Sequence, residues 1–404
     1  MVFPDLEDVV EHIMDELFLD KTDEDGVYDH QRLPKNFLGL ALVSRSFLNP
    51  VRRNIYNHLQ IEGPERFLLL TGQLRFSPHL AKWVKSASLV SGCSERGHID
   101  GDGMDTPGGN VPRTVSYTAL KWFLDACPQL TRIDLSGGDF LWALAAQNPK
   151  NVKLTDVALA GCSMCDPNSP EKCTMELQRG WLKNIVSFPR LKELDISEFP
   201  MHGPRDSTLG IQSNSSACTG LSISNMSSRT SSRALITLLR SMPSLKELAL
   251  DGLHPMPHGD LRQCLNTVAS TLTLLTLSDY HSQEGDPQPW ENDTVSGLHQ
   301  LKTLSLNGVP VTAPFLSSLP ARIEHLRFSG TSLSFLPAPE LAKWLRRKPF
   351  PLHTLKKLEV VGQLRKNSVP RGPKAPDTLV AELGMKCQEL GIEWIHRANL
   401  FERF

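Results

Sequence analysis

The hexapeptide Leu-Lys-Glu-Leu-Ala-Leu at residues 245–250 places apolar side chains at its first, fourth and sixth positions. The same spacing recurs as LTRIDL (130–135), LTDVAL (154–159), LKELDI (191–196), CTGLSI (218–223), LTLLTL (272–277), LKTLSL (301–306), IEHLRF (323–328) and LKKLEV (355–360), with a weaker first copy, VKSASL (84–89). Apolar and polar residues that alternate in this way predict short strands that bury one face. The nine clear copies begin about 22 to 37 residues apart, which indicates a chain of repeated units.

The residues before these hexapeptides predict a helix and a turn in each unit. Leu235, Leu238, Leu239 and Met242 recur at helical spacing, and Pro243 follows them. Proline ends a helix because it lacks the amide proton and disfavours helical geometry at the preceding residue. The same place is held by Pro128, Pro189 and Pro320. One unit is therefore a helix, a turn and a strand, and such units must stack to bury their apolar sides.

These patterns predict an α/β fold, a leucine-rich-repeat solenoid in which a curved parallel sheet carries helices on its outer side. The alternative, a doubly wound α/β sheet, requires continuously apolar strands and a glycine-rich phosphate turn, and the sequence contains neither. In the solenoid the fourth residue of each hexapeptide faces the core. We therefore expect nearly complete burial of Leu194, Leu248, Leu304, Leu326 and Leu358.

The N-terminal residues predict helices of a different kind. Leu6, Val9, Val10, Ile13, Met14 and Leu17 form one apolar stripe at helical spacing. NPVRRNIYNHL (49–59) predicts a further helix, with Asn49 as its cap and Pro50 in its first turn. We therefore expect a small all-α segment ahead of the repeats.

FPDLEDVVEHIMDEL and LALVSRSFLNPVRRNIYNHLQIEG, within about the first sixty residues, resemble the F-box of fungal F-box/leucine-rich-repeat-like proteins. The resemblance implies docking on a Skp-type adaptor protein that links to a cullin scaffold. Carried over by motif position, the docking residues are Phe3, Pro4, Leu6, Ile13, Leu42, Val43 and Phe47. The alternative is that residues 1–60 serve only as the N-terminal cap that a solenoid requires.

Three regions follow from these patterns. Residues 1–60 form the F-box-like helical segment. Residues 61–375 carry irregular leucine-rich repeats, with flexible insertions near 92–112, 203–233 and 279–294, and residues 376–404 form a C-terminal cap. In the cap, LVAELGMKCQEL predicts a helix and IEWI (392–395) predicts a final strand.

The third and fifth residues of each hexapeptide predict a target-binding surface, because they point away from the core on the concave face. The candidate residues there are Arg132, Asp134, Asp156, Glu193, Asp195, Glu247, His325, Arg327 and Lys357. The early repeats are mainly acidic, the middle is neutral and the end leans basic. We therefore expect a protein target with a basic segment that lies across the first repeats.

Composition and motifs exclude several classes of function. The formal net charge of −1 gives no reason to expect nucleic acid as a partner, and no apolar run is long enough to cross a membrane. With an acidic N-terminus in place of a secretory signal, the chain is expected inside the cell, in cytoplasm or nucleus. Cys162, Cys165 and Cys173 contain a single C-x-x-C pair, so neither a metal nor another cofactor is predicted.

No Gly-Lys dipeptide, HExxH or GxSxG motif is present, so no enzymatic activity is predicted. The sequence instead favours a substrate-recognition adaptor of a Skp–cullin–F-box ubiquitin ligase. The alternative is a free-standing leucine-rich-repeat interaction scaffold.

Overall fold

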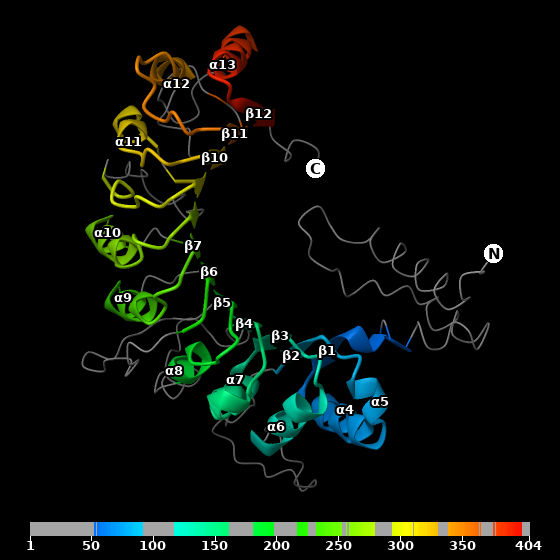
Figure 1. Ribbon diagram of the computed structural model, residues 1–404. Helices are drawn as coiled ribbons and strands as arrows, with labels where there is room; N and C mark the ends of the chain where they lie inside the picture. Colours follow the sequence, from blue (N-terminus) through cyan, green and yellow to red (C-terminus); the bar gives the residue numbers. More distant parts are fainter. Residues whose placement is uncertain are drawn as a thin grey trace, which may run out of the picture. The chain divides into compact units, whose positions relative to one another are not determined.

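The predicted repeat is present in the computed structural model as parallel strands joined by turns and helices (Figure 1). The structure describes residues 52–53, 55–91, 117–160, 181–197, 216–224, 232–252, 256, 258–278, 293–309, 311–329, 338–362, 364, 375 and 377–397. The chain divides into two compact units, residues 1–173 and 174–404. Each unit is built from the same repeat.

The first unit contains four described strands, and adjacent strands pair in parallel in sequence order. The strands are β1 (His58–Glu62), β2 (Ser86–Val90), β3 (Arg132–Ser136) and β4 (Asp156–Ala160). The helices are α4 (Pro64–Phe76), α5 (Pro78–Ala81), α6 (Tyr117–Ala126) and α7 (Gly138–Ala145), with a 3-10 turn, η3 (Pro149–Asn151). Phe67 lies between Phe123 and Phe140 at centroid distances of 5.4 and 5.2 Å, which joins α4, α6 and α7 into one aromatic core.

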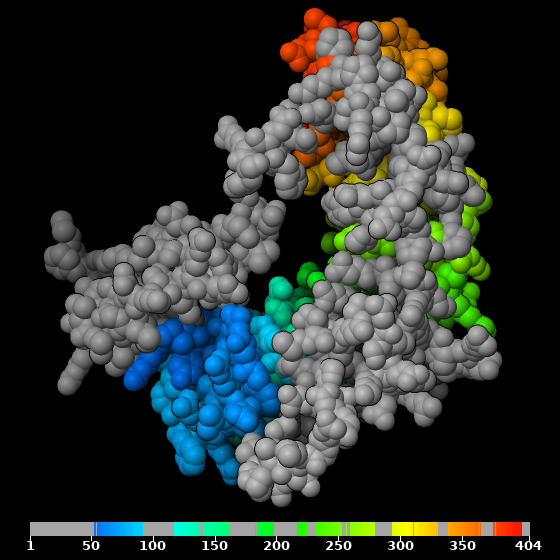
Figure 2. Space-filling model, turned by 180° about the vertical axis from the view of Figure 1, so that it is seen from behind, coloured from blue at the N-terminus to red at the C-terminus, as the bar shows by residue number. Residues whose placement is uncertain are grey.

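The second unit contains eight described strands, again parallel and in sequence order. They are β5 (Glu193–Ser197), β6 (Gly220–Ser224), β7 (Glu247–Asp251), β8 (Leu274–Ser278), β9 (Thr303–Asn307), β10 (His325–Ser329), β11 (Lys357–Val361) and β12 (Glu393–Arg397). The helices are α8 (Trp181–Val186), α9 (Ser232–Arg240), α10 (His258–Thr267), α11 (Ala313–Ser317), α12 (Ala338–Leu345) and α13 (Asp377–Glu389). In Figure 2 the described residues of this unit follow one another from green to red, as expected for stacked repeats.

The hexapeptides form strands in the predicted register. Leu194, Leu248, Leu304, Leu326 and Leu358 are at most 1% exposed, so the expected burial is confirmed. LKELDI and LKELAL supply β5 and β7, which both pair with β6 in parallel. The predicted α/β leucine-rich-repeat solenoid is thus confirmed for the described residues.

The helices follow from apolar spacing, capping and proline. In α9, Leu235, Leu238 and Leu239 are fully buried on one side of the helix, and Pro243 lies beyond its end. At the start of α11 the Thr312 hydroxyl accepts a hydrogen bond from the Phe315 amide at 3.3 Å. Figure 1 shows α9 to α12 on one side of the strands of the second unit. Because no described helix lies on the other side, we call that side the open face.

One strand differs from the expectation. The helix predicted over residues 49–59 ends at Asn57, because His58–Glu62 forms β1 and pairs with β2. Leu59 and Ile61 alternate with polar residues and are buried, which is the pattern of a strand. The strand β1 therefore crosses the boundary placed at residue 60.

The predicted insertions are only partly described. The one near residues 203–233 contains β6 and the start of α9, because CTGLSI belongs to the sheet. The insertions near 92–112 and 279–294 lie outside the described residues, apart from Asp293 and Thr294. In the predicted C-terminal cap, α13 buries Leu383 and Cys387, and the predicted final strand is β12.

Glycines end five of the strands. Gly63, Gly137, Gly252, Gly308 and Gly362 follow β1, β3, β7, β9 and β11 directly and have positive φ angles between 72° and 123°. Each amide donates to the carbonyl of the last residue in the next strand, at 2.7 to 3.4 Å. Only glycine adopts this backbone conformation without strain, so these positions fix the turn that leaves the strand.

Candidate functional site

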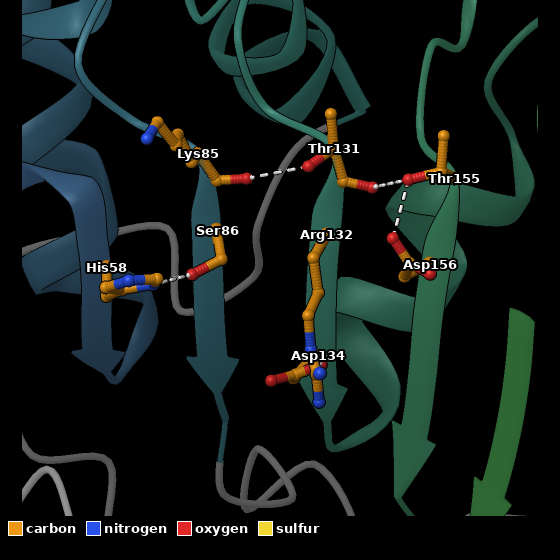
Figure 3. A network of polar contacts seen from close by, with 8 residues as sticks. All are labelled: His58, Lys85, Ser86, Thr131, Arg132, Asp134, Thr155 and Asp156. Carbon is orange, nitrogen blue, oxygen red and sulfur yellow. Dashed lines mark hydrogen bonds and ion pairs between the residues drawn. The ribbon is translucent and has the colours of Figure 1, made fainter. Parts of the chain in front are cut away.

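In each unit the candidate site is the open face of its own strands, which consists of the strand residues that alternate with the buried ones. In the first unit, these side chains are polar or small except Val90. Figure 3 shows His58, Ser86, Arg132, Asp134 and Asp156 among them. His58 Nδ1 lies 2.5 Å from Ser86 Oγ, and the Thr155 hydroxyl donates to Asp156 Oδ2 at 2.5 Å. The first contact joins the side chains of β1 and β2, and the Thr155 hydroxyl also lies 3.2 Å from the Thr131 carbonyl oxygen, just before β3.

Two predicted target-binding residues of the first unit contact each other. Arg132 Nε lies 3.1 Å from Asp134 Oδ1 on strand β3. The Arg132 side chain is 58% exposed and that of Asp134 is 37% exposed, so the ion pair is open to solvent. Because the two charges cancel on the same strand, this part of the open face is less acidic than the sequence suggested. Asp156 is half-buried one strand further along.

The acidic residues of the second unit are differently placed. Glu193, Asp195 and Glu247 are exposed, and no described cation lies on the open face of β5, β6, β7 or β8. Between the two acidic strands, β6 contributes only Gly220, Ser222 and Ser224 to this face. A Cβ atom at Gly220 would lie 3.4 Å from Glu193 Cγ, so the glutamate stem leans over the glycine.

The middle of the open face carries no charged side chain among the described residues. Strands β8 and β9 present Leu274, Thr276, Thr303 and Ser305, all half-buried. At the ends of these strands Asn307 Nδ2 donates to Ser278 Oγ at 3.1 Å, and Ser329 donates to Asn307 Oδ1. This row of side-chain hydrogen bonds joins β8, β9 and β10.

The last strands carry the predicted basic residues. His325 and Arg327 are exposed on β10, and Lys357 is half-buried directly opposite His325 on β11. Glu359 is largely covered, with a side chain 12% exposed and Arg397 Nε at 3.7 Å. Glu359 is therefore neutralised by Arg397 of β12.

A second set of charges lies just before the strands. Glu324 Oε2 accepts a hydrogen bond from Lys356 Nζ at 2.5 Å, and Lys302 Nζ lies 3.5 Å from Glu324 Oε1. The hydrogen bond from Lys356 holds the pKa of the Glu324 carboxyl below its ordinary value. The three residues hold the starts of β9, β10 and β11 together.

Four cysteines are part of the core. Cys127, Cys218, Cys264 and Cys387 are buried free thiols. Burial raises the pKa of Cys127, Cys218 and Cys264 from 9.0 to about 12, and that of Cys387 to about 11. Thiols of this kind are poor nucleophiles, because the reactive thiolate is scarce.

We expect these four thiols to resist alkylation in the native protein. A pKa of about 12 in place of 9.0 lowers the thiolate fraction at pH 8 about a thousandfold. Iodoacetamide labelling, read by mass spectrometry in a chain with serine at Cys93, Cys162, Cys165 and Cys173, checks this. Labelling should become rapid in denaturant, and rapid labelling without denaturant would contradict the buried assignment.

Several predictions fall outside what the structure describes. The adaptor-binding residues Phe3, Pro4, Leu6, Ile13, Leu42, Val43 and Phe47 lie outside the described residues, as do Cys162, Cys165 and Cys173. Among the side chains that are described, no group of three or more His, Cys, Asp or Glu could hold a metal ion. Nor does the described part of the chain include a helix long and apolar enough to cross a membrane.

Comparison with known proteins finds likenesses among solved structures alone. Neither a family model nor a curated protein matches the sequence. Among solved structures, a chain from the crystal structure of the Rad7 and Elc1 complex in yeast matches with 15% identity. The match covers 96% of this chain and 91% of that chain, with a TM-score of 0.42. A likeness at this level carries no argument about partners or activity.

Proposed function

We propose that this protein is the substrate-recognition adaptor of a Skp–cullin–F-box ubiquitin ligase. In this proposal the N-terminal segment binds a Skp-type protein through Phe3, Pro4, Leu6, Ile13, Leu42, Val43 and Phe47. The open face of the repeats binds a protein target through Arg132, Asp134, Asp156, Glu193, Asp195, Glu247, His325, Arg327 and Lys357.

The observation that supports target binding is the open face itself. Its side chains are held in register by parallel strands, and several of its charged groups are exposed and carry no ion pair among the described residues, Glu193, Glu247 and Arg327 among them. A rigid sheet with exposed polar side chains and no described helix above it is suited to recognising another protein. Support for the adaptor half of the proposal comes from the F-box-like residues of the N-terminal segment.

The adaptor role predicts a loss of binding after two substitutions. We expect Pro4→Ala with Leu6→Ala to abolish co-purification with a Skp-type protein, because the resemblance places both residues in the docking motif. Thermal unfolding of the double variant should match that of the unchanged chain.

A matched control replaces the same residue types elsewhere. Leu69 is 71% exposed on α4, and Pro78 is exposed at the start of α5. Leu69→Ala with Pro78→Ala should leave co-purification unchanged. Equal recovery of the unchanged chain and of the Pro4 and Leu6 variant would instead favour the free-standing scaffold.

A further inference from the structure

The open face of the second unit carries its charges in a fixed order. One row of directly paired residues crosses it from β5 to β11: Glu193, Gly220, Glu247, Leu274, Thr303, His325 and Lys357. The adjacent row runs Asp195, Ser222, Ala249, Thr276, Ser305, Arg327 and Glu359. Both rows begin acidic and are neutral in the middle.

Among the described strand residues, the acidic end of this face carries no cationic side chain. Glu193, Asp195, Glu247 and Asp251 all belong to the open face of β5 and β7, and β6 adds no charge between them. No described ion pair involves Glu193 or Glu247. Lys192 and Lys246 precede these strands and are not part of the face. Cationic groups can therefore approach this end without displacing a partner from either glutamate.

The basic end lies on β10 and β11. His325, Arg327 and Lys357 have no ion pair among the described residues, and Arg397 engages Glu359. Glu393 lies opposite Lys357 on β12 and marks the limit of this end. Strands are about 4.8 Å apart, so four steps from β7 to β11 place Glu247 about 19 Å from Lys357.

We propose that the open face of the second unit binds a protein segment of two opposite charges. The segment is cationic where it crosses β5 to β7, uncharged across β8 and β9, and anionic across β10 and β11. Complementary charge at both ends fixes the direction of the segment as well as its position. An extended chain of about six residues spans the 19 Å between the ends at about 3.3 Å per residue. This inference rests on the proposed function, because it names the chemistry of the target on the same face.

The test uses the full chain and three synthetic peptides in low salt. The bipolar peptide is Lys-Lys-Lys, five Gly-Ser pairs and Glu-Glu-Glu; two others carry serine in place of one charged end. A ten-residue Gly-Ser linker has a root-mean-square length of about 16 to 19 Å, which matches the spacing. We expect the bipolar peptide to bind about tenfold more tightly than either single-charge peptide, because both ends engage together.

Charge reversals test each end separately. Glu193→Lys with Glu247→Lys, and likewise Arg327→Glu with Lys357→Glu, should each weaken binding of the bipolar peptide about fivefold or more. All four changes together should restore the affinity, with the peptide now bound in the opposite direction. A benzoylphenylalanine beside the lysines reports direction, because its cross-links should move from β5–β7 to β10–β11.

A matched control reverses two arginines on a helix. Arg233 and Arg240 are exposed on α9, so Arg233→Glu with Arg240→Glu makes the same change in net charge as Arg327→Glu with Lys357→Glu, but away from the open face. An equal loss of binding in this control, or cross-links that do not move in the fourfold variant, would overturn the proposal. Failure of the Skp-type interaction would overturn only the adaptor role, because no Skp-type protein takes part in this assay.

Discussion

Leu248→Ala is expected to lower the free energy of unfolding by about 2 to 5 kcal/mol. Leu248 is fully buried in β7 and lies directly opposite Leu221 of β6 and Leu275 of β8. Truncation removes the apolar contacts of the side chain and leaves a cavity that the flanking strands cannot close without losing their pairing. Urea unfolding monitored by circular dichroism measures the loss.

The control for Leu248 is a leucine on the other side of the sheet. Leu274 begins β8 on the open face and is only half-buried, so Leu274→Ala should cost about 1 kcal/mol or less. Equal losses for the two variants would show that the strands do not bury the fourth hexapeptide position preferentially. The pair therefore tests the register directly.

The strands were predictable because their pattern is local. In LKELAL the buried and exposed residues alternate, and the parallel sheet pairs Leu248 with its equivalents in neighbouring repeats.

The sequence also contained a signal for the turns that we missed. Glycine directly follows the strands in QIEG, DLSG, ALDG, SLNG and EVVG, and the structure shows why: each glycine has a positive φ angle and an amide bonded to the next strand.

Strand β1 was missed for a physical reason. His58–Glu62 follows a helix directly, and its polar residues gave a weaker alternation than the hexapeptides. Leu59 and Ile61 become strand residues through pairing with Ala87 and Leu89 of β2, 28 residues away. Such long-range pairing overrides the local preference for helix.

The charges of the open face were predictable only in part. The third and fifth positions of the hexapeptides correctly identified these charged residues as strand residues outside the core. Which of these charged groups are without an ion pair depends on contacts that the spacing of residues in the sequence does not reveal. Arg132 forms an ion pair with Asp134, and Arg397 forms one with Glu359. Glu193 and Glu247 stay exposed because the strand between them contributes glycine and serine.

Gly137→Ala should be among the most damaging small substitutions in the first unit. Gly137 has a φ angle of 94°, and a Cβ atom there would lie 2.1 Å from the carbonyl oxygen of Ser91. The backbone conformation costs a residue with a side chain about 1 to 3 kcal/mol. Moving Ser91 away from the added Cβ atom raises the loss of stability by a further amount of about 1 to 3 kcal/mol, because the Ser91 amide donates a hydrogen bond to the Ser136 carbonyl at 2.7 Å.

Two other glycines of the same unit separate the cost of the backbone conformation from the cost of the overlap with Ser91. Gly63 has a φ angle of 87° but no atom within 4 Å of the added Cβ, so Gly63→Ala should incur only the conformational cost. Gly72 lies within α4 with open space around it, and Gly72→Ala should stabilise the protein by about 0.5 to 1 kcal/mol. Thermal and urea unfolding should therefore show that the Gly72→Ala variant is the most stable of the three, the Gly63→Ala variant is intermediate and the Gly137→Ala variant is the least stable. Similar losses at Gly63 and Gly137 would mean that the close approach of Ser91 does not contribute, since only that contact distinguishes the two turns.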